Sequence, residues 1–352
     1  MINGRVWRVV RFGDPAEAME LQEVSWLDPP IGQVLVRVRA AGAGLPDLLM
    51  TRGRFPLLGE PPFGLGEEVA GDVVAVAPGS RFTAGDTIMG ITAFLEGWGG
   101  YADYAYVHEQ SAARVPASLS DEQAAGFPIG FRTAYAGLVE RARLAAGEVL
   151  LVLGAAGSAG SAAVQLGRAL GATVIAVAGS SEKADFCLRS GASHAINYKT
   201  ADLTGEIADL TYGHGADLVY DTVGGDLAAT SVASLARGGR IAIIGMASGA
   251  TVELNSLDML LRNYSAVGVL ASGYAPDEDA TAWQALTDLA DRGKITTPVG
   301  TVYAFEDVPA MIAQQASPPP GKSVVRVRRL ADDHPEVFLS GHAVAGAECS
   351  RR

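Results

Sequence analysis

Residues 148–177 carry the clearest pattern of apolar positions in the chain. Val149–Leu153 is an uninterrupted apolar run, typical of a strand that is covered on both faces of a parallel sheet. A glycine-rich turn follows, and small and apolar residues then predict a helix from Ser161 to Leu170, ended by Gly171. Thr173–Val177 is a second apolar run. Strand, turn, helix and strand in this order predict a βαβ unit.

The segment before this unit has the pattern of strands rather than helices. Val34–Ala40 and Val69–Ala77 alternate at the strand period, and Pro-Pro, Pro-Gly and Gly-Gly pairs separate such runs. Ser120 followed by Gln123 predicts the start of one helix, because this pair forms a capping box.

The segment after the unit alternates between strands and helices. Further strands are expected at Ala216–Tyr220, Arg240–Ile244 and Ala266–Leu270. Helices are expected at Ser181–Ser190, Leu203–Thr211, Leu227–Leu235 and Ser256–Arg262. This alternation predicts an α/β fold with a doubly wound parallel sheet.

The remaining pattern predicts that the chain returns to its first part. Ala280–Arg292 is expected to be an amphipathic helix, Asp307 to cap a shorter one, and Ser323–Val327 to be a closing strand. We therefore divide the chain into residues 1–125, residues 126–265, a return over residues 266–330, and a tail over residues 331–352 that we expect to be disordered.

Composition and charge exclude several classes of function. The 352 residues are 49% apolar and 19% charged, and the net charge of −12 argues against a nucleic acid or an anionic membrane as partner. No apolar run is long enough to span a bilayer, and the N-terminus lacks a secretory signal pattern, so we expect a cytoplasmic location. With only Cys187 and Cys349, a four-cysteine zinc site is impossible.

The glycine turn has the chemistry of a phosphate site. Gly157 would let backbone N–H groups approach a pyrophosphate at the positive end of the helix, and Gly160 would let helix and strand pack closely. The spacing G-x-x-G-x-x-G departs from the dinucleotide fingerprint G-x-G-x-x-G, because the first glycine of that fingerprint would fall at Ala155. A tight turn that binds nothing is the alternative.

Several motifs together are more specific than this turn. They are GLGEEVAGDV at 64–73, GGYADY at 99–104, GAAGSAG at 154–160, GSSEK at 179–183, INY at 196–198, DLVYDTVGG at 217–225, GGRIAIIG at 238–245 and GKSVV at 321–325. With them, residues 1 to about 328 resemble the medium-chain dehydrogenase/reductase superfamily, and most of all its zinc-free quinone oxidoreductase branch, which includes zeta-crystallin. The resemblance implies a Rossmann sheet (residues 126–265) plus a strand-rich GroES-like catalytic domain, and a homodimer.

The resemblance also implies a set of cofactor-binding residues. Around the glycine turn they are Ala155, Ala156, Gly157, Ser158, Ala159 and Gly160. At the ends of the other strands they are Gly179, Ser180, Ser181, Lys183, Tyr198, Thr222, Val223, Gly224, Gly245, Met246, Ala247, Val269 and Leu270. Thr133 and Lys322 are expected near the cofactor as well.

The end of the second Rossmann strand indicates NADPH rather than NADH. An NAD enzyme usually carries an acidic residue there, which would repel a 2′-phosphate, whereas Ser180, Ser181 and Lys183 suit a phosphate. The resemblance implies that Tyr198 closes over this phosphate. Glu182 counts against this assignment. The alternative is that Ser180 merely caps the following helix.

No catalytic metal is expected. In the zinc enzymes of the superfamily three separated ligands hold the ion, and Gly44, Glu67 and Ile129 stand at those positions here. Without a Lewis acid, alcohol dehydrogenation is disfavoured, and hydride transfer to an electron-poor acceptor is favoured.

The expected substrate side is apolar. The superfamily often has an asparagine after G-x, but this chain has Gly44, and Phe55 stands near the tyrosine that donates a proton in related enoyl-thioester reductases. A phenyl ring donates no proton. A slot for a flat ring is expected from Leu45, Phe55, Phe94, Trp98 and Phe131.

These observations predict an NADPH-dependent, zinc-independent reductase of quinones or similar conjugated carbonyl compounds. No side-chain acid is assigned, because a reduced quinone can take its proton from water. One alternative is an enoyl-thioester or 2-alkenal reductase in which Tyr101 or Tyr104 donates the proton. Another is a nucleotide-binding protein with marginal catalysis.

Overall fold

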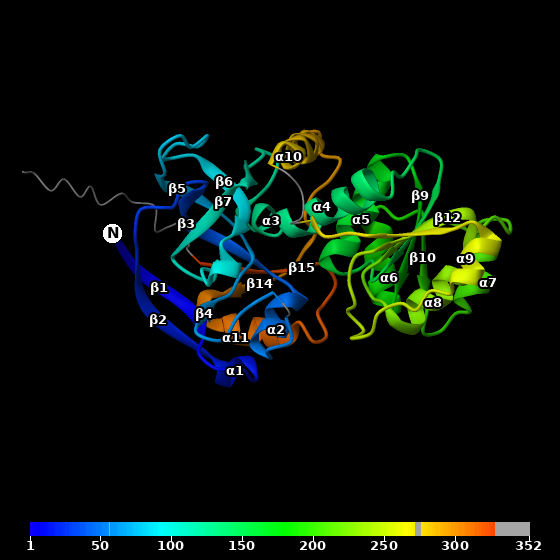
Figure 1. The fold of residues 1–352 in the computed structure, drawn as a ribbon, viewed down its shortest axis with the longest axis horizontal. Helices are drawn as coiled ribbons and strands as arrows, with labels where there is room; N and C mark the ends of the chain where they lie inside the picture. The colour runs from blue at the N-terminus through cyan, green and yellow to red at the C-terminus, as the bar shows by residue number, and fades with distance from the viewer. Residues whose placement is uncertain (56, 272–275, 328–352) are drawn as a thin grey trace, which may run out of the picture.

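A computed structural model describes residues 1–55, 57–271 and 276–327. Two parts lie side by side along the long axis of the molecule (Figure 1). One part holds the N-terminal strands and the other holds the parallel sheet. Helices α4 (Pro128–Tyr135) and α10 (Pro276–Asp291) lie between them.

The first part is built on a six-stranded sheet with the order β14-β15-β3-β5-β6-β7. Its strands are β3 (Gln33–Ala43), β5 (Glu68–Val76), β6 (Thr87–Thr92), β7 (Tyr104–Arg114), β14 (Val299–Ala304) and β15 (Lys322–Arg326). A smaller sheet of order β2-β1-β4 packs beside it, formed by β1 (Ile2–Val9), β2 (Met19–Trp26) and β4 (Phe63–Gly64). The short helices of this part are α1 (Pro15–Ala18), α2 (Leu45–Thr51), α3 (Asp121–Ala125), α11 (Val308–Gln314) and the 3₁₀ turns Phe94–Glu96 and Phe305–Asp307.

The second part is a parallel sheet of order β10-β9-β8-β11-β12-β13. The order reverses between β8 and β11, as in doubly wound Rossmann folds. Its strands are β8 (Val149–Leu153), β9 (Thr173–Ala178), β10 (His194–Asn197), β11 (Ala216–Asp221), β12 (Leu235–Ile243) and β13 (Ser265–Gly268). Its helices are α5 (Ser158–Ala169), α6 (Ser181–Arg189), α7 (Leu203–Leu210), α8 (Gly225–Ala233) and α9 (Ser256–Arg262), and α4 continues into the π-helical turn Ala136–Arg141.

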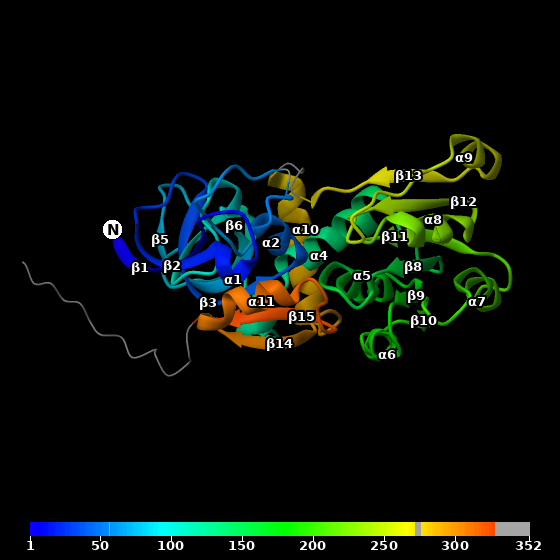
Figure 2. The same ribbon diagram turned by 90° about the horizontal axis from the view of Figure 1, so that it is seen from below.

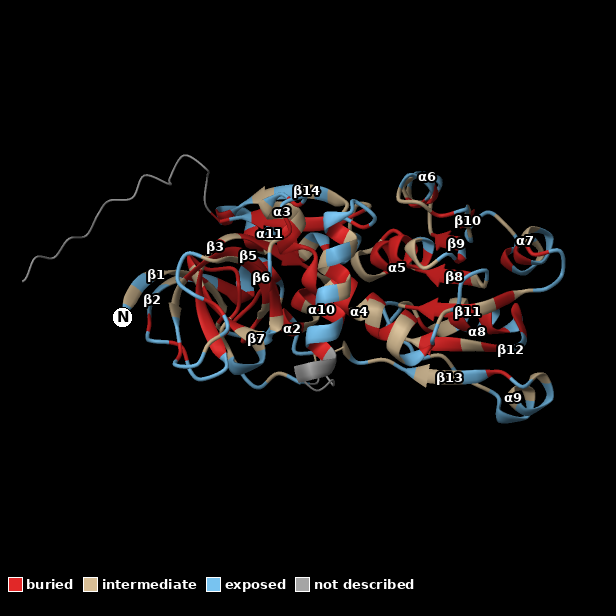
Figure 3. Cartoon of the chain, turned by 90° about the horizontal axis from the view of Figure 1, so that it is seen from above, coloured by how far each residue is buried: buried red, intermediate tan, exposed pale blue. Residues whose placement is uncertain are grey.

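Burial on both faces explains the uninterrupted apolar run of β8. Leu150 and Val152 belong to the core under α4 and α5, whereas Leu151 and Leu153 belong to the core under α7 and α8. Successive side chains of a strand point to opposite faces, so a strand covered on both sides needs apolar residues at every position. Figure 3 shows these strands buried and the outer helix faces exposed.

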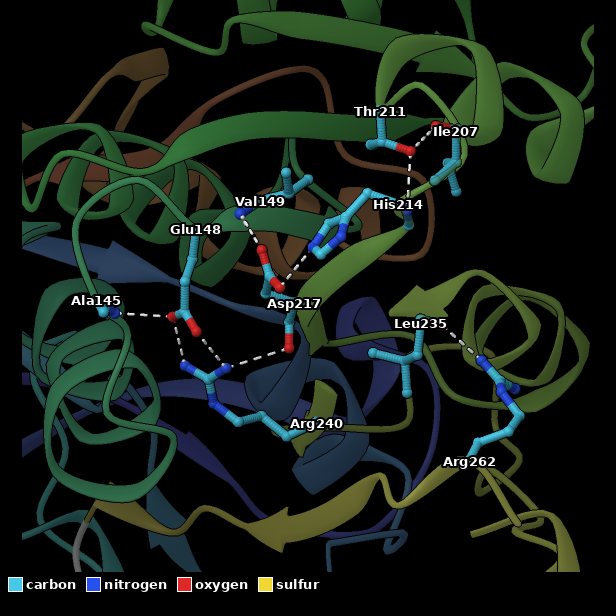
Figure 4. A network of polar contacts seen from close by, with 11 residues as sticks. Ala145, Glu148, Val149, Ile207, Thr211, His214, Asp217, Leu235, Arg240 and Arg262 are labelled. Atoms are coloured by element: carbon cyan, nitrogen blue, oxygen red, sulfur yellow. Dashed lines mark hydrogen bonds and ion pairs between the residues drawn. The ribbon is translucent and has the colours of Figure 1, made fainter. Parts of the chain in front are cut away.

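A polar network joins the amino ends of the central Rossmann strands (Figure 4). Arg240 of β12 donates to both carboxylate oxygens of Glu148, at 2.9 and 2.7 Å. Asp217 accepts from the backbone N–H of Val149 at 2.8 Å and lies 2.9 Å from His214 Nε2. Because the ligands of such sheets bind at the carboxyl ends of the strands, this network has a structural role.

The strands and helices predicted from periodicity are present, with different ends. The helix expected from Ser161 starts at Ser158, and Ser120 and Gln123 form the predicted capping box. Asp307 precedes α11, but its side chain makes no capping hydrogen bond. The predicted division at residue 265 falls at the start of β13, which pairs with β12 and therefore belongs to the Rossmann sheet. The tail expected over residues 331–352 lies outside the described residues.

Candidate functional site

The glycine turn between β8 and α5 has one glycine that protein packing does not explain. Gly154 has a φ of +64°, and a Cβ on Gly160 would lie 2.8 Å from Ala155 Cα, so both positions need glycine. Gly157 has an ordinary φ of −82°, and a Cβ there would meet only Gly154 O, at 3.4 Å. Gly157 is the residue before the first turn of α5, so its small size leaves room for an anionic group at the helix N-terminus. The turn therefore fits a pyrophosphate.

The loops after β11 and β12 lie side by side at the carboxyl end of the sheet. Ala247 N–H donates to Thr222 O at 3.1 Å, and Ser248 N–H donates to Val223 O at 2.9 Å. Thr222 Oγ1 donates to Leu153 O at 2.9 Å, which connects these loops to the end of β8. The predicted residues of the two loops are thus brought next to the glycine turn: Thr222, Val223, Gly224, Gly245, Met246 and Ala247.

The residues expected to read the nucleotide lie together after β9. Ser180 Oγ accepts from Lys183 N–H at 3.2 Å and so caps α6, as the alternative interpretation expected. Capping uses only an oxygen lone pair, so the hydroxyl proton stays free to be donated to a phosphate. A Cβ on Gly179 would lie 3.4 Å from Tyr198 Cε1 and 3.6 Å from Lys199 Cε. Lys199 is a second cation at this place that sequence reasoning missed.

Lys322 lies in a buried ion pair. Its side chain is 3% exposed and its ammonium contacts Glu68 Oε1. Glu68 Oε2 accepts from the backbone N–H of Ile129 at 2.8 Å. The lysine stem is packed between two glycines, since a Cβ on Gly42 would lie 2.8 Å from Lys322 Cε and one on Gly126 2.6 Å from Lys322 Cγ. The pair therefore joins β5, β15 and the start of α4.

Two contacts connect this ion pair to the glycine turn. Gly321, directly before Lys322, donates its N–H to Ala156 O at 3.0 Å. Gly130, directly after Ile129, lies against α5, because a Cβ there would be 3.2 Å from Ser158 Oγ. The predicted cofactor residues Thr133 and Lys322 thus lie at the border between the two parts.

Three further ionisable groups are buried at the same border. Asp47 accepts from Gly44 N–H at 2.8 Å, Gly66 N–H at 3.2 Å and Tyr101 Oη–H at 2.9 Å. Burial raises the pKa of Asp47 to about 6 against these hydrogen bonds. Burial, followed by the nearby charges of Asp47 and Glu68, raises the pKa of Glu67 well above its usual range. Tyr101 is fully buried, and burial and Asp47 raise its pKa.

The three positions at which the zinc enzymes hold their ion converge here. Gly44 and Glu67 both lie beside Asp47, and Ile129 is bonded to the neighbouring Glu68. Gly44 and Ile129 have no side chain that binds a metal. In residues 1–55, 57–271 and 276–327 no three His, Cys, Asp or Glu side chains form a group that could hold a metal ion.

The five residues expected to form one apolar slot belong to three different hydrophobic clusters of the structure. Phe131 is 1% exposed, stacks on Phe127 at 4.3 Å and belongs to the core between the two parts. Trp98 belongs to an aromatic cluster of the smaller sheet, 6.1 Å from Trp26. Three of the five, Leu45, Phe55 and Phe94, pack on a shared core. The sequence indicates that these side chains are apolar, but it does not show which residues they contact in the folded protein.

Tyr104 also lies away from the border. Its ring is 5.6 Å from that of Trp26, in the same aromatic cluster as Trp98. The tyrosine that reaches the ionisable cluster is Tyr101, whose hydroxyl group donates a hydrogen bond to Asp47.

The predicted cofactor residues Val269 and Leu270 lie at the edge of the Rossmann sheet. The backbone N–H of Val269 donates to Ile243 O at 3.1 Å, and Leu270 is exposed.

Comparisons with known proteins agree with this geometry. A family model described as alcohol dehydrogenase GroES-like domain matches residues 30–117, and one described as zinc-binding dehydrogenase matches residues 159–291. The quinone oxidoreductase-like protein 2 of Bos taurus is 30% identical over 310 residues, covering 87% of this chain and 88% of its own. The chain belongs to the medium-chain dehydrogenase/reductase superfamily.

Its similarity to quinone oxidoreductases extends along most of the chain. Human quinone oxidoreductase is 29% identical over 308 residues, covering 86% of this chain and 91% of its own. A crystal structure of Escherichia coli quinone oxidoreductase complexed with NADPH is 28% identical, with a TM-score of 0.82, covering 92% of this chain and all of the other. These matches confirm the fold predicted for this superfamily member, a parallel Rossmann sheet with a strand-rich GroES-like domain.

Sequence reasoning missed the buried cluster in this member of the superfamily. The sequence pattern identifies Glu67 only as the replacement of a zinc ligand, and it assigns no role to Asp47 or Lys199. A signal was available, because GLGEEVAGDV places two adjacent acidic residues at the start of an apolar strand. Adjacent residues of a strand point to opposite faces, so one of the two is expected to be buried.

No helix of the described residues is long and apolar enough to cross a membrane.

Proposed function

We propose that this protein is an NADPH-dependent, zinc-independent reductase of quinones or similar conjugated carbonyl compounds, and that it acts as a homodimer. The observation that carries the choice of NADPH is the group after β9, where Tyr198 and Lys199 lie against Gly179 and the neighbouring Ser180 caps the helix that carries Lys183. Two hydroxyl groups and two cations suit a 2′-phosphate. The names of the quinone oxidoreductase relatives support the acceptor class.

The chain's own residues would bind and orient the reactants. The N–H groups that open α5 would hold the pyrophosphate beside Gly157, and the loops after β11 and β12 would hold the nicotinamide ribose. When bound, the nicotinamide supplies a hydride. The protein contributes position and a dry environment, and neither requires a metal ligand at Gly44 or Ile129.

A second candidate is a reductase of 2-alkenals or enoyl thioesters. These substrates need a proton on carbon as well as a hydride, and Phe55 and Tyr104 do not supply one at the border between the two parts. The buried carboxyl group of Glu67 favours this candidate, because it is a proton source that quinone chemistry does not require.

The test is NADPH oxidation by the purified protein with benzoquinone, crotonaldehyde and a crotonyl thioester, repeated with NADH. We expect turnover of benzoquinone with NADPH, and unchanged turnover after exhaustive chelation of metals. Absence of turnover with every acceptor and both nucleotides, in a protein that binds NADPH, would support marginal catalysis instead. Activity lost on chelation and restored by zinc contradicts the zinc-independent assignment.

A further inference from the structure

Glu67 is a buried acid with no assigned role. The residue is 9% exposed, and Oε1 is fully buried without a hydrogen-bond partner among the described residues. The charged groups that face it are Asp47, Glu68 and Lys322, and the neutral Tyr101 hydroxyl lies beyond Asp47. The single ammonium group of Lys322 is already paired with Glu68.

An ionised Glu67 would be costly at this place. A carboxylate buried next to two other carboxyl groups loses its hydration without gaining a partner of its own. The effects of burial and of Asp47 and Glu68 exceed the opposing effect of Lys322, so the pKa of Glu67 lies well above its usual range. The arrangement of these groups therefore favours the protonated form of the Glu67 carboxyl group, which lies beside Asp47 and Glu68 at the border between the two parts.

The position of Glu67 places this proton near the candidate cofactor site. Its backbone is fixed by Thr92 N–H, which donates to Glu67 O at 2.9 Å. The next residue, Glu68, contacts both Lys322 and the N-terminus of α4. Both contacts reach the glycine turn. Gly321, directly before Lys322, is bonded to Ala156, and Gly130 in the first turn of α4 lies against Ser158.

We propose that Glu67 donates the proton that completes reduction of a conjugated carbonyl compound, an inference that rests on the reductase function proposed above. The β-carbon of the acceptor gains a hydride with both electrons, and its carbon–carbon double bond becomes an enolate. The O–H bond of Glu67 then breaks as a C–H bond forms at the α-carbon. The Glu67 carboxylate regains a proton from water before the next turnover, and Lys322 favours its transient charge.

This role distinguishes two classes of acceptor. An enolate must be protonated on carbon, which is slow without a positioned acid, and general acids contribute about 100- to 10,000-fold to such steps. A reduced quinone is protonated on oxygen, which water does readily. The loss of the Glu67 proton should therefore matter for an enal and not for a quinone.

The kinetic test compares Glu67→Gln and Glu67→Asp with the wild type, using crotonaldehyde and benzoquinone. Glu67→Gln should lower kcat/KM for crotonaldehyde about 100-fold or more and for benzoquinone less than about threefold. Glu67→Asp keeps the acid and should recover at least about a tenth of the crotonaldehyde activity. Equal losses for both acceptors, no loss for crotonaldehyde, or a wild type that reduces only benzoquinone overturn the inference. A wild type that reduces neither acceptor refutes the reductase function itself.

A second measurement needs no turnover. The infrared spectrum of the protein without nucleotide at pH 7 should contain the carbonyl band of a protonated carboxylic acid, and Glu67→Gln should remove it. Glu60→Gln, which changes an exposed glutamate, is the matched control and should leave the band in place. A wild-type spectrum without this band, or a band that survives in Glu67→Gln, overturns the inference even if that variant is too unstable for kinetics.

Discussion

Individual lysines near β9 test the nucleotide preference. Lys183→Ala should weaken NADPH binding about 10- to 100-fold and leave NADH binding nearly unchanged, because a charged hydrogen bond to phosphate contributes about 1.5–3 kcal/mol. Lys199→Ala should act in the same direction. Fluorescence titration of both nucleotides measures this, with the exposed Lys294→Ala as control. Equal losses for NADPH and NADH would show that neither lysine reads the 2′-phosphate.

The proton held by Glu67 should also appear in the pH dependence of stability. The folded protein keeps this proton, whereas the unfolded chain releases it near the usual pKa of 4.5. As the pH rises above that value the wild type loses up to about 1.4 kcal/mol per pH unit until the folded-state pKa is passed. Glu67→Gln lacks this loss, so its Tm relative to the wild type should rise between pH 5 and pH 8. A constant difference in Tm would mean that Glu67 is ionised in the folded protein.

The sequence predicted the roles of residues in local turns and helix caps, but it did not predict which distant residues come into contact. Gly157 and Ser180 stand in a local turn and a helix cap, which sequence spacing describes well. Glu67 depends on Asp47 and Lys322, which are distant in sequence and meet only in the folded sheet. Trp98 shows the same limit, since it lies in a loop and its partner Trp26 lies at the end of β2, far away in the sequence.

At the scale of elements, the turn between β8 and α5 offers a matched pair of substitutions. Gly157→Ala adds a methyl group that meets only Gly154 O at 3.4 Å, so we expect a change in stability within about 1 kcal/mol and at least about tenfold weaker NADPH binding. Gly160→Ala places its methyl group 2.8 Å from Ala155 Cα and should cost about 1–3 kcal/mol of stability. Urea unfolding and nucleotide titration separate the two effects. NADPH binding unchanged in Gly157→Ala would contradict a pyrophosphate site in this turn.

Element types followed from the sequence because burial determines apolar spacing. A strand such as β8, covered on both faces, leaves an uninterrupted run, and the capping box at Ser120 marks a helix start locally. For β15, the sequence predicts only a closing strand that belongs to the first part of the molecule, and it does not predict the pairing with β3. Its register depends on contacts between residues about 280 positions apart, such as Ser323 with Ala43, which periodicity does not encode.

For the whole molecule, the edge strand β13 tests the proposed dimer. Val269 N–H is bonded to Ile243 of β12, and alternate residues of a parallel strand face the same neighbour. Val267 therefore faces β12, and Ala266 directs its N–H outward. Helix α9 lies at one end of β13 (Figure 3), and its Leu257, Leu260 and Leu261 are exposed.

Ala266→Pro removes an outward donor and should yield a folded monomer, whereas Val267→Pro breaks the pairing with β12 and should destabilise the sheet. Sedimentation at micromolar concentration measures the first effect and thermal unfolding the second. A wild type that sediments as a monomer, or an Ala266→Pro variant that remains dimeric, contradicts assembly through β13.

The pairing of β15 with β3 also sets an order of events during synthesis. Ala40–Ala43 of β3 pair with Ser323–Arg326, so the first sheet has an incomplete edge until nearly the whole described chain has left the ribosome. All six strands of the Rossmann sheet lie within residues 149–268, so that sheet can close earlier. The part that begins first is therefore completed last, and its final strand follows directly after Gly321, which is bonded to the glycine turn in the folded protein.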